Sequence, residues 1–216
     1  MGSSDDEPFN QMIEYESQKH GDILQGNFLD QFKQTNFKSI AALTWLTTNC
    51  QNVKYYIKLK HDIEINPMKL DQYLKDSLTI NPLKNNLLFC DFKFRPKVDR
   101  DKESKFYVKF KEHQRYFYDY KYVCSENGYV LSNRLARNIF KYSFYSELFW
   151  IDDVYIAKIY DNLQDLIATK IEFLTISYES FELLNENSTL FYKHNVKLTT
   201  DFVYAWNLIK KTLGIL

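Results

Sequence analysis

The sequence contains few of the residues that break or cross-link a chain: five glycines, four prolines and three cysteines among 216 residues. So little glycine and proline argues against a fibrous or disordered protein. Three cysteines do not form a disulfide framework, and their odd number leaves at least one unpaired or bonded to another molecule. No C-x-x-C spacing indicates a zinc site. The length suits one domain with a sizeable core.

The sequence also has no excess of charge, because 28 basic residues balance 28 acidic ones. A nucleic-acid partner is therefore not expected, nor is attraction to an anionic membrane. No apolar run approaches the ~20 residues of a transmembrane helix. The start of the chain, Met1 to Asn10, is polar and acidic and does not have the pattern of a signal peptide. The residues alone indicate a cytosolic chain.

Aromatic residues are abundant, with 17 Tyr and 17 Phe, which predicts an aromatic-rich core. Residues 1–13 are expected to form a disordered or frayed tail. A helical pattern begins at Phe37 and continues through Ile40, Ala41, Thr44, Trp45 and Thr48. Trp45 is predicted to be largely buried, because it extends the apolar face of that helix.

Expected strands alternate with expected helices in the rest of the chain. Strand patterns cover residues 53–57, 87–92, 106–110, 129–131 and 171–176. Helix starts are expected at Asn66-Pro67, at Asn133, at Asp152-Asp153 and at residues 199–201, the last before Phe202, Trp206 and Ile209. The charge run at residues 99–103 is expected to be a loop. The alternation predicts one α/β domain whose central sheet includes residues 53–57, with the Trp45 helix packed on it.

Four segments carry candidate chemistry: residues 22–39, 55–66, 124–132 and 152–157. Taken in this order, they resemble the β-1,3-galactosyltransferase family of Golgi glycosyltransferases over roughly residues 14–210. The resemblance implies a GT-A-like (Rossmann-like) single domain at residues 14–216, with a mixed central sheet flanked by helices. The N-terminal strands of that fold have no visible counterpart before Glu14. In the first segment Asp22, Phe28, Asp30 and Lys38 match the family's pattern.

The segment after the strand at residues 53–57 corresponds to the family's Lys-x-Asp-Asp-Asp-Val-Phe-Val-Asn, whose carboxylates hold a divalent metal such as Mn²⁺ against the donor's diphosphate. Lys58, Asp62 and Asn66 match, but Lys60 and His61 stand where the first two Asp belong. The resemblance implies Asp62 and His194 as metal ligands. A charged lysine cannot ligate a metal, so weakened or absent Mn²⁺ binding is predicted.

Three interpretations of this loop remain open. Lys60 offsets the diphosphate charge in place of the metal, or the site has decayed, or the segment is an exposed loop of mixed charge. The resemblance implies Lys58, Lys60, Asp62 and Gly128 as donor-binding residues. Gly128 keeps a family glycine that lets the backbone approach bound sugars, whereas Glu126 replaces another and is expected to crowd or repel the donor. An ordinary Asn-Gly turn is the alternative there.

The segment at residues 152–157 corresponds to the family's Glu-Asp-Val-Tyr-Val-Gly, in which the Asp is the general base. Asp153 aligns with that base and is expected to take the proton from the acceptor hydroxyl. The alternative is that the Asp pair only caps a helix. If Asp153 is the base, it must share a cleft with Asp62.

The resemblance implies an inverting hexosyltransferase that moves galactose or N-acetylglucosamine from a UDP-sugar, in β-1,3 linkage, to a glycan on a glycoprotein or glycolipid. It also implies a type II membrane protein facing the Golgi lumen, attached through an anchor that this chain lacks. One alternative is a catalytically decayed relative that binds glycans or a partner protein. Without the resemblance, a soluble aromatic-rich α/β interaction domain is the third hypothesis.

Overall fold

The computed structural model describes residues 1–61, 63–65, 67–80, 86–114, 119–167, 173–174, 179–180, 191–193, 207 and 210. The chain forms two compact units. The first unit contains Met1–Lys54, Phe94–Val123 and Ala136–Thr169, and the second contains Tyr55–Lys93, Cys124–Leu135 and Lys170–Leu216. Because each unit is assembled from separate stretches of chain, no linker in the sequence marks the boundary between them.

The strands in the described part of the chain form two small sheets. The four-stranded sheet has the order β1-β4-β3-β5, and the three-stranded sheet has the order β2-β7-β6. The first sheet is mixed, because β1 runs antiparallel to β4 whereas β3 runs parallel to β5. Their bounds are β1 Tyr55–Leu59, β2 Ile63–Ile65, β3 Leu88–Phe94, β4 Tyr122–Ser132, β5 Phe173–Leu174, β6 Glu179–Ser180 and β7 Phe191–Lys193. The predicted strand at residues 53–57 is therefore shifted towards the loop that follows it.

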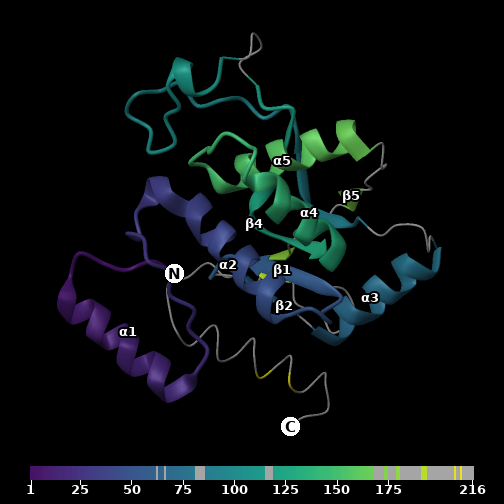
Figure 1. Ribbon diagram of the computed structural model, residues 1–216. Helices are drawn as coiled ribbons and strands as arrows, with labels where there is room; N and C mark the ends of the chain where they lie inside the picture. The colour runs from purple at the N-terminus through teal and green to yellow at the C-terminus, as the bar shows by residue number, and fades with distance from the viewer. Residues whose placement is uncertain are drawn as a thin grey trace. The chain divides into compact units, whose positions relative to one another are not determined.

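The core of the second unit lies between α3 (Pro67–Ile80) and the strands (Figure 1). Leu70 and Leu74 recur one helical turn apart, so both side chains point to the same side of α3. They form one buried cluster with Ile63, Leu87, Phe89 and Val130. The helix begins at Pro67, as the sequence predicts, whereas the expected cap Asn66 lies outside the described residues.

A disulfide joins Cys90 on β3 to Cys124 on β4, with 5.5 Å between their Cα atoms. These strands are neighbours in the four-stranded sheet, so the bond cross-links the core of the second unit. Cys50, at the end of α2, is the free cysteine expected from the odd count.

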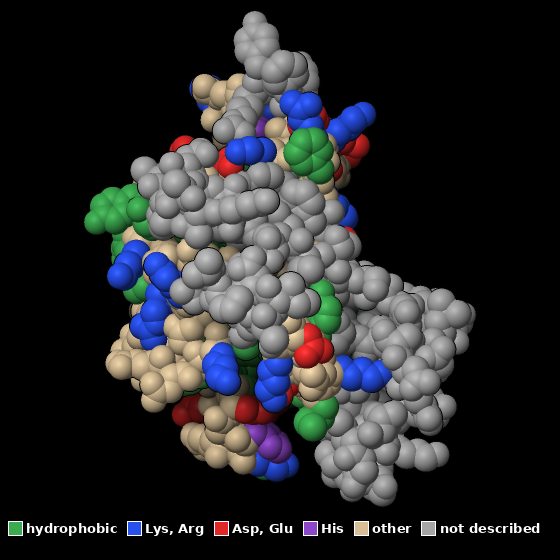
Figure 2. Space-filling view, turned by 90° about the vertical axis from the view of Figure 1, so that its right-hand side faces the viewer, with side chains coloured by type: hydrophobic (Ala, Val, Ile, Leu, Met, Phe, Trp, Pro, Cys, Tyr) green, Lys and Arg blue, Asp and Glu red, His purple; other side chains and the backbone are tan. Residues whose placement is uncertain are grey.

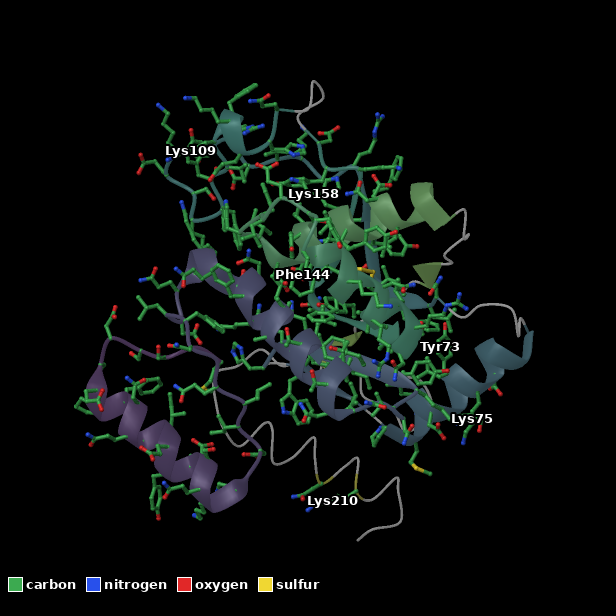
Figure 3. All side chains as sticks on the ribbon, in the orientation of Figure 1. Tyr73, Lys75, Lys109, Phe144, Lys158 and Lys210 are labelled. Carbon is green, nitrogen blue, oxygen red and sulfur yellow. A yellow bond between two sulfur atoms is a disulfide. The ribbon has the colours of Figure 1, made fainter. Side chains whose placement is uncertain are left out.

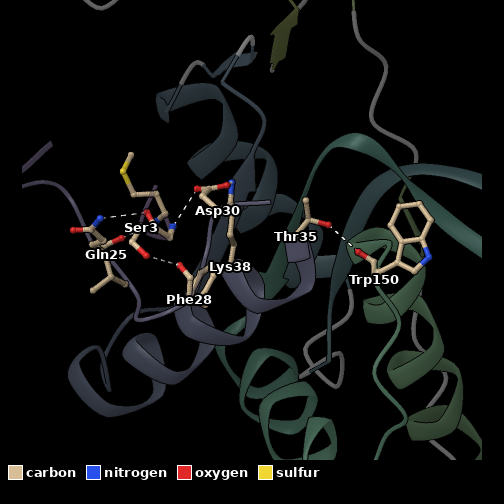
Figure 4. A network of polar contacts seen from close by, with 10 residues as sticks. Ser3, Gln25, Phe28, Asp30, Thr35, Lys38 and Trp150 are labelled. Atoms are coloured by element: carbon tan, nitrogen blue, oxygen red, sulfur yellow. Dashed lines mark hydrogen bonds and ion pairs between the residues drawn. The ribbon is translucent and has the colours of Figure 1, made fainter. Parts of the chain in front are cut away.

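Helices dominate the first unit: α1 (Glu7–His20), α2 (Thr35–Asn49), most of α4 (Asn133–Ser143) and α5 (Asp152–Ile167). The short 3-10 helices η1 (Phe32–Gln34) and η2 (Phe110–Glu112) lie in the connections that the structure describes. Helix α2 packs against α5, and the Thr35 hydroxyl donates to the Trp150 carbonyl at 2.9 Å (Figure 4). The Tyr155 hydroxyl of α5 donates to the Ser143 carbonyl of α4 at 3.2 Å. A mixed α/β architecture with helix-covered strands is thus confirmed, and it is compatible with a GT-A-like fold.

The prediction that Trp45 is buried is wrong, because its side chain is 46% exposed. The buried stripe of α2 consists of Asn36, Ser39, Leu43 and Leu46. Trp45 follows Leu43 by two residues, which is a rotation of about 200° around the helix axis. Trp45 therefore points away from the side on which Leu43 is buried. The sequence pattern selected the wrong face because the true buried stripe begins with two polar residues.

The expectation of a frayed tail over residues 1–13 also differs from the structure, because α1 already begins at Glu7. The Gly2 amide donates to the Asp30 carboxylate at 3.1 Å, and the Lys38 ammonium lies 2.6 Å from the same group (Figure 4). Burial opposes the charge of Asp30, but Lys38 and the Gly2 amide outweigh it and lower the pKa of this carboxyl. Asp30 and Lys38, which match the family's pattern, thus hold the start of the chain in place.

Residues 106–110 do not form the predicted strand. They belong to a loop that ends in η2, and Arg100 fixes its course. The Arg100 guanidinium donates to the Val108 carbonyl at 2.7 Å and to the His113 carbonyl at 2.8 Å. A neighbouring strand would need these two carbonyl groups as acceptors for its own backbone amides, and here they accept from Arg100 instead. The expected loop at residues 99–103 is confirmed.

Candidate functional site

Lys58 lies on β1, where its register partner on β4 is Tyr129. Its ammonium group lies 5.1 Å from the centre of the Tyr129 ring. A cation over an aromatic face is attracted by the negative charge density of the ring. The sheet therefore holds this lysine near the end of β1.

Lys60 lies in a tight turn between β1 and β2. Its backbone amide donates to the Asn127 carbonyl, and its own carbonyl accepts from the Ile63 amide, both at 3.0 Å. This turn places the half-buried Lys60 and the exposed His61 just beyond the end of the strand. Asp62 lies outside the described residues, and so does the side chain of Glu126. Their expected roles stay predictions.

Gly128 has a structural reason to be glycine. It pairs with Leu59, and its φ of +148° is one that residues with a side chain rarely adopt. A Cβ atom at this position would lie 2.4 Å from the Lys58 carbonyl oxygen. Glycine is therefore required at this position because the backbone of β1 lies too close for a side chain. The donor-binding role of Gly128 stays a prediction.

The weakened or absent Mn²⁺ binding expected at this turn stays a prediction, and Lys60 is its chemical reason. The Lys60 ammonium is a donor only, so it cannot replace the carboxylate oxygens that a hard cation requires. Among the described residues, no three His, Cys, Asp or Glu side chains form a metal-binding group. Both implied ligands, Asp62 and His194, lie outside those residues, so their approach to one another stays a prediction.

Asp153 lies in the first turn of α5. The helix begins at Asp152, and the Tyr155 amide donates to the Ile151 carbonyl at 2.9 Å. Ile151 therefore occupies the cap position, and Asp153 lies inside the helix. Asp153 is half-buried between the buried Asp152 and Val154. Asp153 thus lies on a regular helix, and its role as the general base stays a prediction. A negative charge in the first turn also interacts favourably with the helix dipole.

The implied site residues belong to both units. Asp153 is in the first, whereas Lys58, Lys60, Asp62, Gly128 and His194 are in the second. The cleft that Asp153 and Asp62 are expected to share stays a prediction.

A cavity of about 520 Å³ lies beside α5 and was not anticipated from the sequence. Val154, Ala157, Lys158 and Asp161 line it from one side of the helix. Residues 111–114, 120 and 121 line it as well, and burial raises the pKa of Tyr120 to about 12. The sequence does contain a signal for this cavity, since positions i, i+3, i+4 and i+7 share a helix face.

The surface charge agrees with the balanced composition. Both acidic and basic side chains lie on the face shown in Figure 2. None of the helices in the described part of the chain is both long enough and apolar enough to span a membrane.

Comparison with curated proteins gives relatives that include two glycosyltransferases of different name. The rat UDP-GlcNAc:betaGal beta-1,3-N-acetylglucosaminyltransferase 7 is 32% identical over 149 residues, which is 69% of this chain and 36% of the relative. The mouse Beta-1,3-galactosyltransferase 1 is 30% identical over 160 residues, which is 73% of this chain and 47% of the relative. The chain therefore spans less than half the length of these relatives.

One solved structure, a glycosyltransferase involved in the glycosylation of the major capsid of PBCV-1, superposes with a TM-score of 0.42 and 8% sequence identity. The superposition covers 94% of this chain and 89% of that one, but a TM-score this low does not by itself assign a fold. The family model for galactosyltransferases matches residues 1–170. This match covers most of the chain and agrees with the two curated relatives, and the chain therefore belongs to the galactosyltransferase family.

Proposed function

We propose that this chain carries the catalytic base and part of the donor site of an inverting hexosyltransferase. The proposed donor is UDP-galactose or UDP-N-acetylglucosamine, and the product is a β-1,3 linkage to a glycan on a glycoprotein or glycolipid. The observation that carries the proposal is the placement of Asp153. This carboxylate is half-buried in the first turn of α5, between buried neighbours, in a chain that belongs to the family.

Asp153 accepts the proton of the acceptor hydroxyl as that oxygen attacks the anomeric carbon of the donor sugar. The new bond forms as the bond from the anomeric carbon to UDP breaks, and UDP leaves with the electron pair. One displacement inverts the configuration at that carbon. The rigid helix holds the base within hydrogen-bond reach of the hydroxyl, which is the geometric requirement for general-base catalysis.

The leaving diphosphate needs positive charge, which the family supplies through a divalent metal. Lys60 does not fit a metal site, but its ammonium group is itself a cation. It lies beyond the end of β1, in a turn whose backbone bonds to Asn127 and Ile63 fix its start. In this proposal Lys60 offsets the diphosphate charge directly. Lys58 is the second proposed donor-binding lysine, and its ammonium group lies beside the Tyr129 ring.

The disulfide supports the lumen of the Golgi as the location. Disulfides persist in oxidising compartments and are rare in the cytosol. Cys90 and Cys124 are joined across neighbouring strands of the core, where the bond stabilises the fold itself. A lumenal chain with this bond is consistent with a glycan acceptor on secretory glycoproteins or glycolipids.

A second candidate is a catalytically decayed relative that binds glycans or a partner protein. The observation that favours it is the pair Lys60 and His61, which replaces two family carboxylates at the strand end. Such a relative keeps the fold and the site that binds a glycan or a partner protein, but it no longer binds the UDP-sugar donor.

A panel of UDP-sugars tests the two candidates. Transfer to a mixed glycan pool, donor hydrolysis and UDP binding are measured for the wild type. The same assays are made on a variant with Lys60→Asp, His61→Asp and Glu126→Gly. Transfer by the wild type without added Mn²⁺, lost in Lys60→Met, supports the hexosyltransferase. An inactive wild type and an active, Mn²⁺-dependent triple variant establish the decayed relative. Inactivity of both proteins, with no UDP binding, contradicts the proposed donor site.

A further inference from the structure

Helix α1 has an inner side that packs on the rest of the first unit. Asn10, Ile13 and Ser17 lie on this side, where Ile13 is buried and the other two are half-buried. The Asn10 side chain donates to the Ser4 carbonyl and accepts from the Ser4 amide, each at 2.8 Å. The three positions recur at intervals of three and four residues, so they form one stripe along the helix. The first unit therefore holds α1 by this inner stripe.

The opposite side of α1 carries an outer stripe that consists of Pro8, Met12, Tyr15 and Lys19. Each of these residues lies two positions from a member of the inner stripe, which is a rotation of about 200° around the helix axis. The side chains of Met12 and Tyr15 are 67% and 69% exposed, although both are large. An open cavity of about 550 Å³ follows the outer stripe, and side chains project from both sides of α1 in Figure 3. An apolar stripe exposed on a helix is typical of an interaction surface.

The charges of α1 change sign from one end of the helix to the other. Asp5, Asp6 and Glu7 lie at its start, Lys19 and His20 lie in its last turn, and all five are exposed. A second α1 in antiparallel orientation would place its basic end beside this acidic start, and the two helix dipoles would also be opposed. A parallel pair would bring like charges together at each end. The charge pattern is therefore complementary to a second, antiparallel copy of the same helix.

The outer stripe is also complementary to itself in this orientation. The midpoint of α1 lies between residues 13 and 14. When a two-fold axis passes through this midpoint, Met12 of one copy faces Tyr15 of the other. Pro8 likewise faces Lys19, whose aliphatic stem can cover the proline ring while its ammonium group reaches towards Asp5. Such a contact is isologous, so it closes at two copies and covers both stripes.

We propose that two copies of this chain associate through the outer stripe of α1, in antiparallel orientation. This inference is independent of the proposed transferase, because none of the residues in the stripe is a donor-binding, metal or base position. Phe9, which is 50% exposed, adds a third large side chain at the edge of the stripe. The resulting interface is near the lower limit of about 1,000 Å² that stable interfaces bury. The association is therefore weak, with an expected Kd of about 1 µM to 1 mM.

Sedimentation equilibrium of the full chain measures this Kd, at concentrations from about 1 µM to 1 mM. Met12→Gln combined with Tyr15→Ser removes the centre of the stripe and should weaken association by at least about tenfold. Met68→Gln combined with Tyr145→Ser is the matched control, because these side chains are 65% and 88% exposed and lie outside α1. The control should stay within about twofold of the wild type. Circular dichroism checks that both variants remain folded.

Disulfide trapping tests the orientation. Pro8→Cys and Lys19→Cys are made separately in a chain that also carries Cys50→Ser, which removes the free native cysteine. Equal amounts of the two variants should form a mixed cross-linked dimer, because residues 8 and 19 face one another in the antiparallel pair. Neither variant alone should cross-link. Two residues 8 would lie about 16 Å apart along the helix axis, whereas a disulfide needs Cα atoms within about 7 Å of one another.

Four results would overturn the inference. Cross-linking of either cysteine variant with itself indicates a parallel pair and contradicts the antiparallel arrangement. A wild type that stays monomeric up to about 1 mM excludes the association. An unchanged Kd for the variant of Met12 and Tyr15 places the interface elsewhere on the chain. A monomeric wild type that binds phospholipid vesicles, and loses this binding in the same variant, identifies a membrane as the occupant of the stripe instead of a second copy.

Discussion

Replacing Gly128 by alanine tests why this residue is a glycine. The added Cβ would lie 2.4 Å from the Lys58 carbonyl oxygen and 3.2 Å from the Leu59 Cα, both of which belong to the backbone of β1 and cannot move aside alone. A residue with a side chain at positive φ costs about 1–3 kcal/mol, and forcing extra volume into a packed site costs about 1–3 kcal/mol more. Gly128→Ala should therefore lower the free energy of unfolding by about 2–6 kcal/mol.

Gly21 provides the matched control. It also has a positive φ, +66°, but a Cβ there would meet no atom within 4 Å. Gly21→Ala should cost only the conformational term, about 1–2 kcal/mol. Urea unfolding followed by circular dichroism compares the two variants. The explanation is refuted if Gly128→Ala is no more destabilising than Gly21→Ala. If Gly128→Ala remains stable but loses UDP binding, the glycine serves the donor instead of the strand.

Three further predictions concern the core. Leu43→Ala should destabilise the protein by about 2–5 kcal/mol, whereas Trp45→Ala should cost less, and the reverse order in urea would restore Trp45 to the core. Replacing both Cys90 and Cys124 by serine should cost about 3–4 kcal/mol, since the bond closes a loop of 34 residues; an unchanged unfolding midpoint would show that the bond does not stabilise the fold. Burial raises the pKa of Tyr120 to about 12, so the native state retains this proton above pH 10 while the unfolded chain loses it. The free energy of unfolding of the wild type should then fall, relative to that of Tyr120→Phe, by about 1.4 kcal/mol per pH unit from pH 10 to 12. Parallel plots of this free energy against pH for the two proteins would contradict the raised pKa.

The sequence predicted the elements whose signals are local. The Asn-Pro pair marks the start of α3, and the apolar run before Phe92 became β3. The segment at Asp152 and Asp153 became α5, with Asp153 in its first turn. In each case the turn chemistry or the period of the pattern suffices, because no distant residue is needed to decide it.

The errors arose where distant contacts decide the structure. The exposure of Trp45 was not predicted, because the buried face of α2 begins with the polar residues Asn36 and Ser39. Residues 106–110 form a loop in which the Val108 carbonyl accepts from the Arg100 side chain, and a strand pattern alone cannot show this contact. The cavity beside α5 is lined by residues distant in the sequence, so no local pattern reveals it.

The candidate site was predicted through motifs more than through geometry. Motif positions identified Lys60 and Asp153, and the structure adds the turn and the helix that hold them. The motif gave Gly128 a role next to the donor, whereas the register of β1 and β4 gives it a role in the sheet. A one-dimensional pattern does not distinguish these roles, because both require the same absence of a side chain.

The most direct test of the account is transfer by Asp153→Asn with the donor that the wild type uses. Asparagine keeps the shape of the side chain but cannot accept the proton. Turnover should fall by ~10²–10⁴-fold while the affinity for UDP-sugar changes little. Asp5→Asn, the same change at an exposed position, should leave turnover unaltered. Full activity of Asp153→Asn would contradict the account, because the residue would then stabilise a helix terminus and the proposed transferase would have no base.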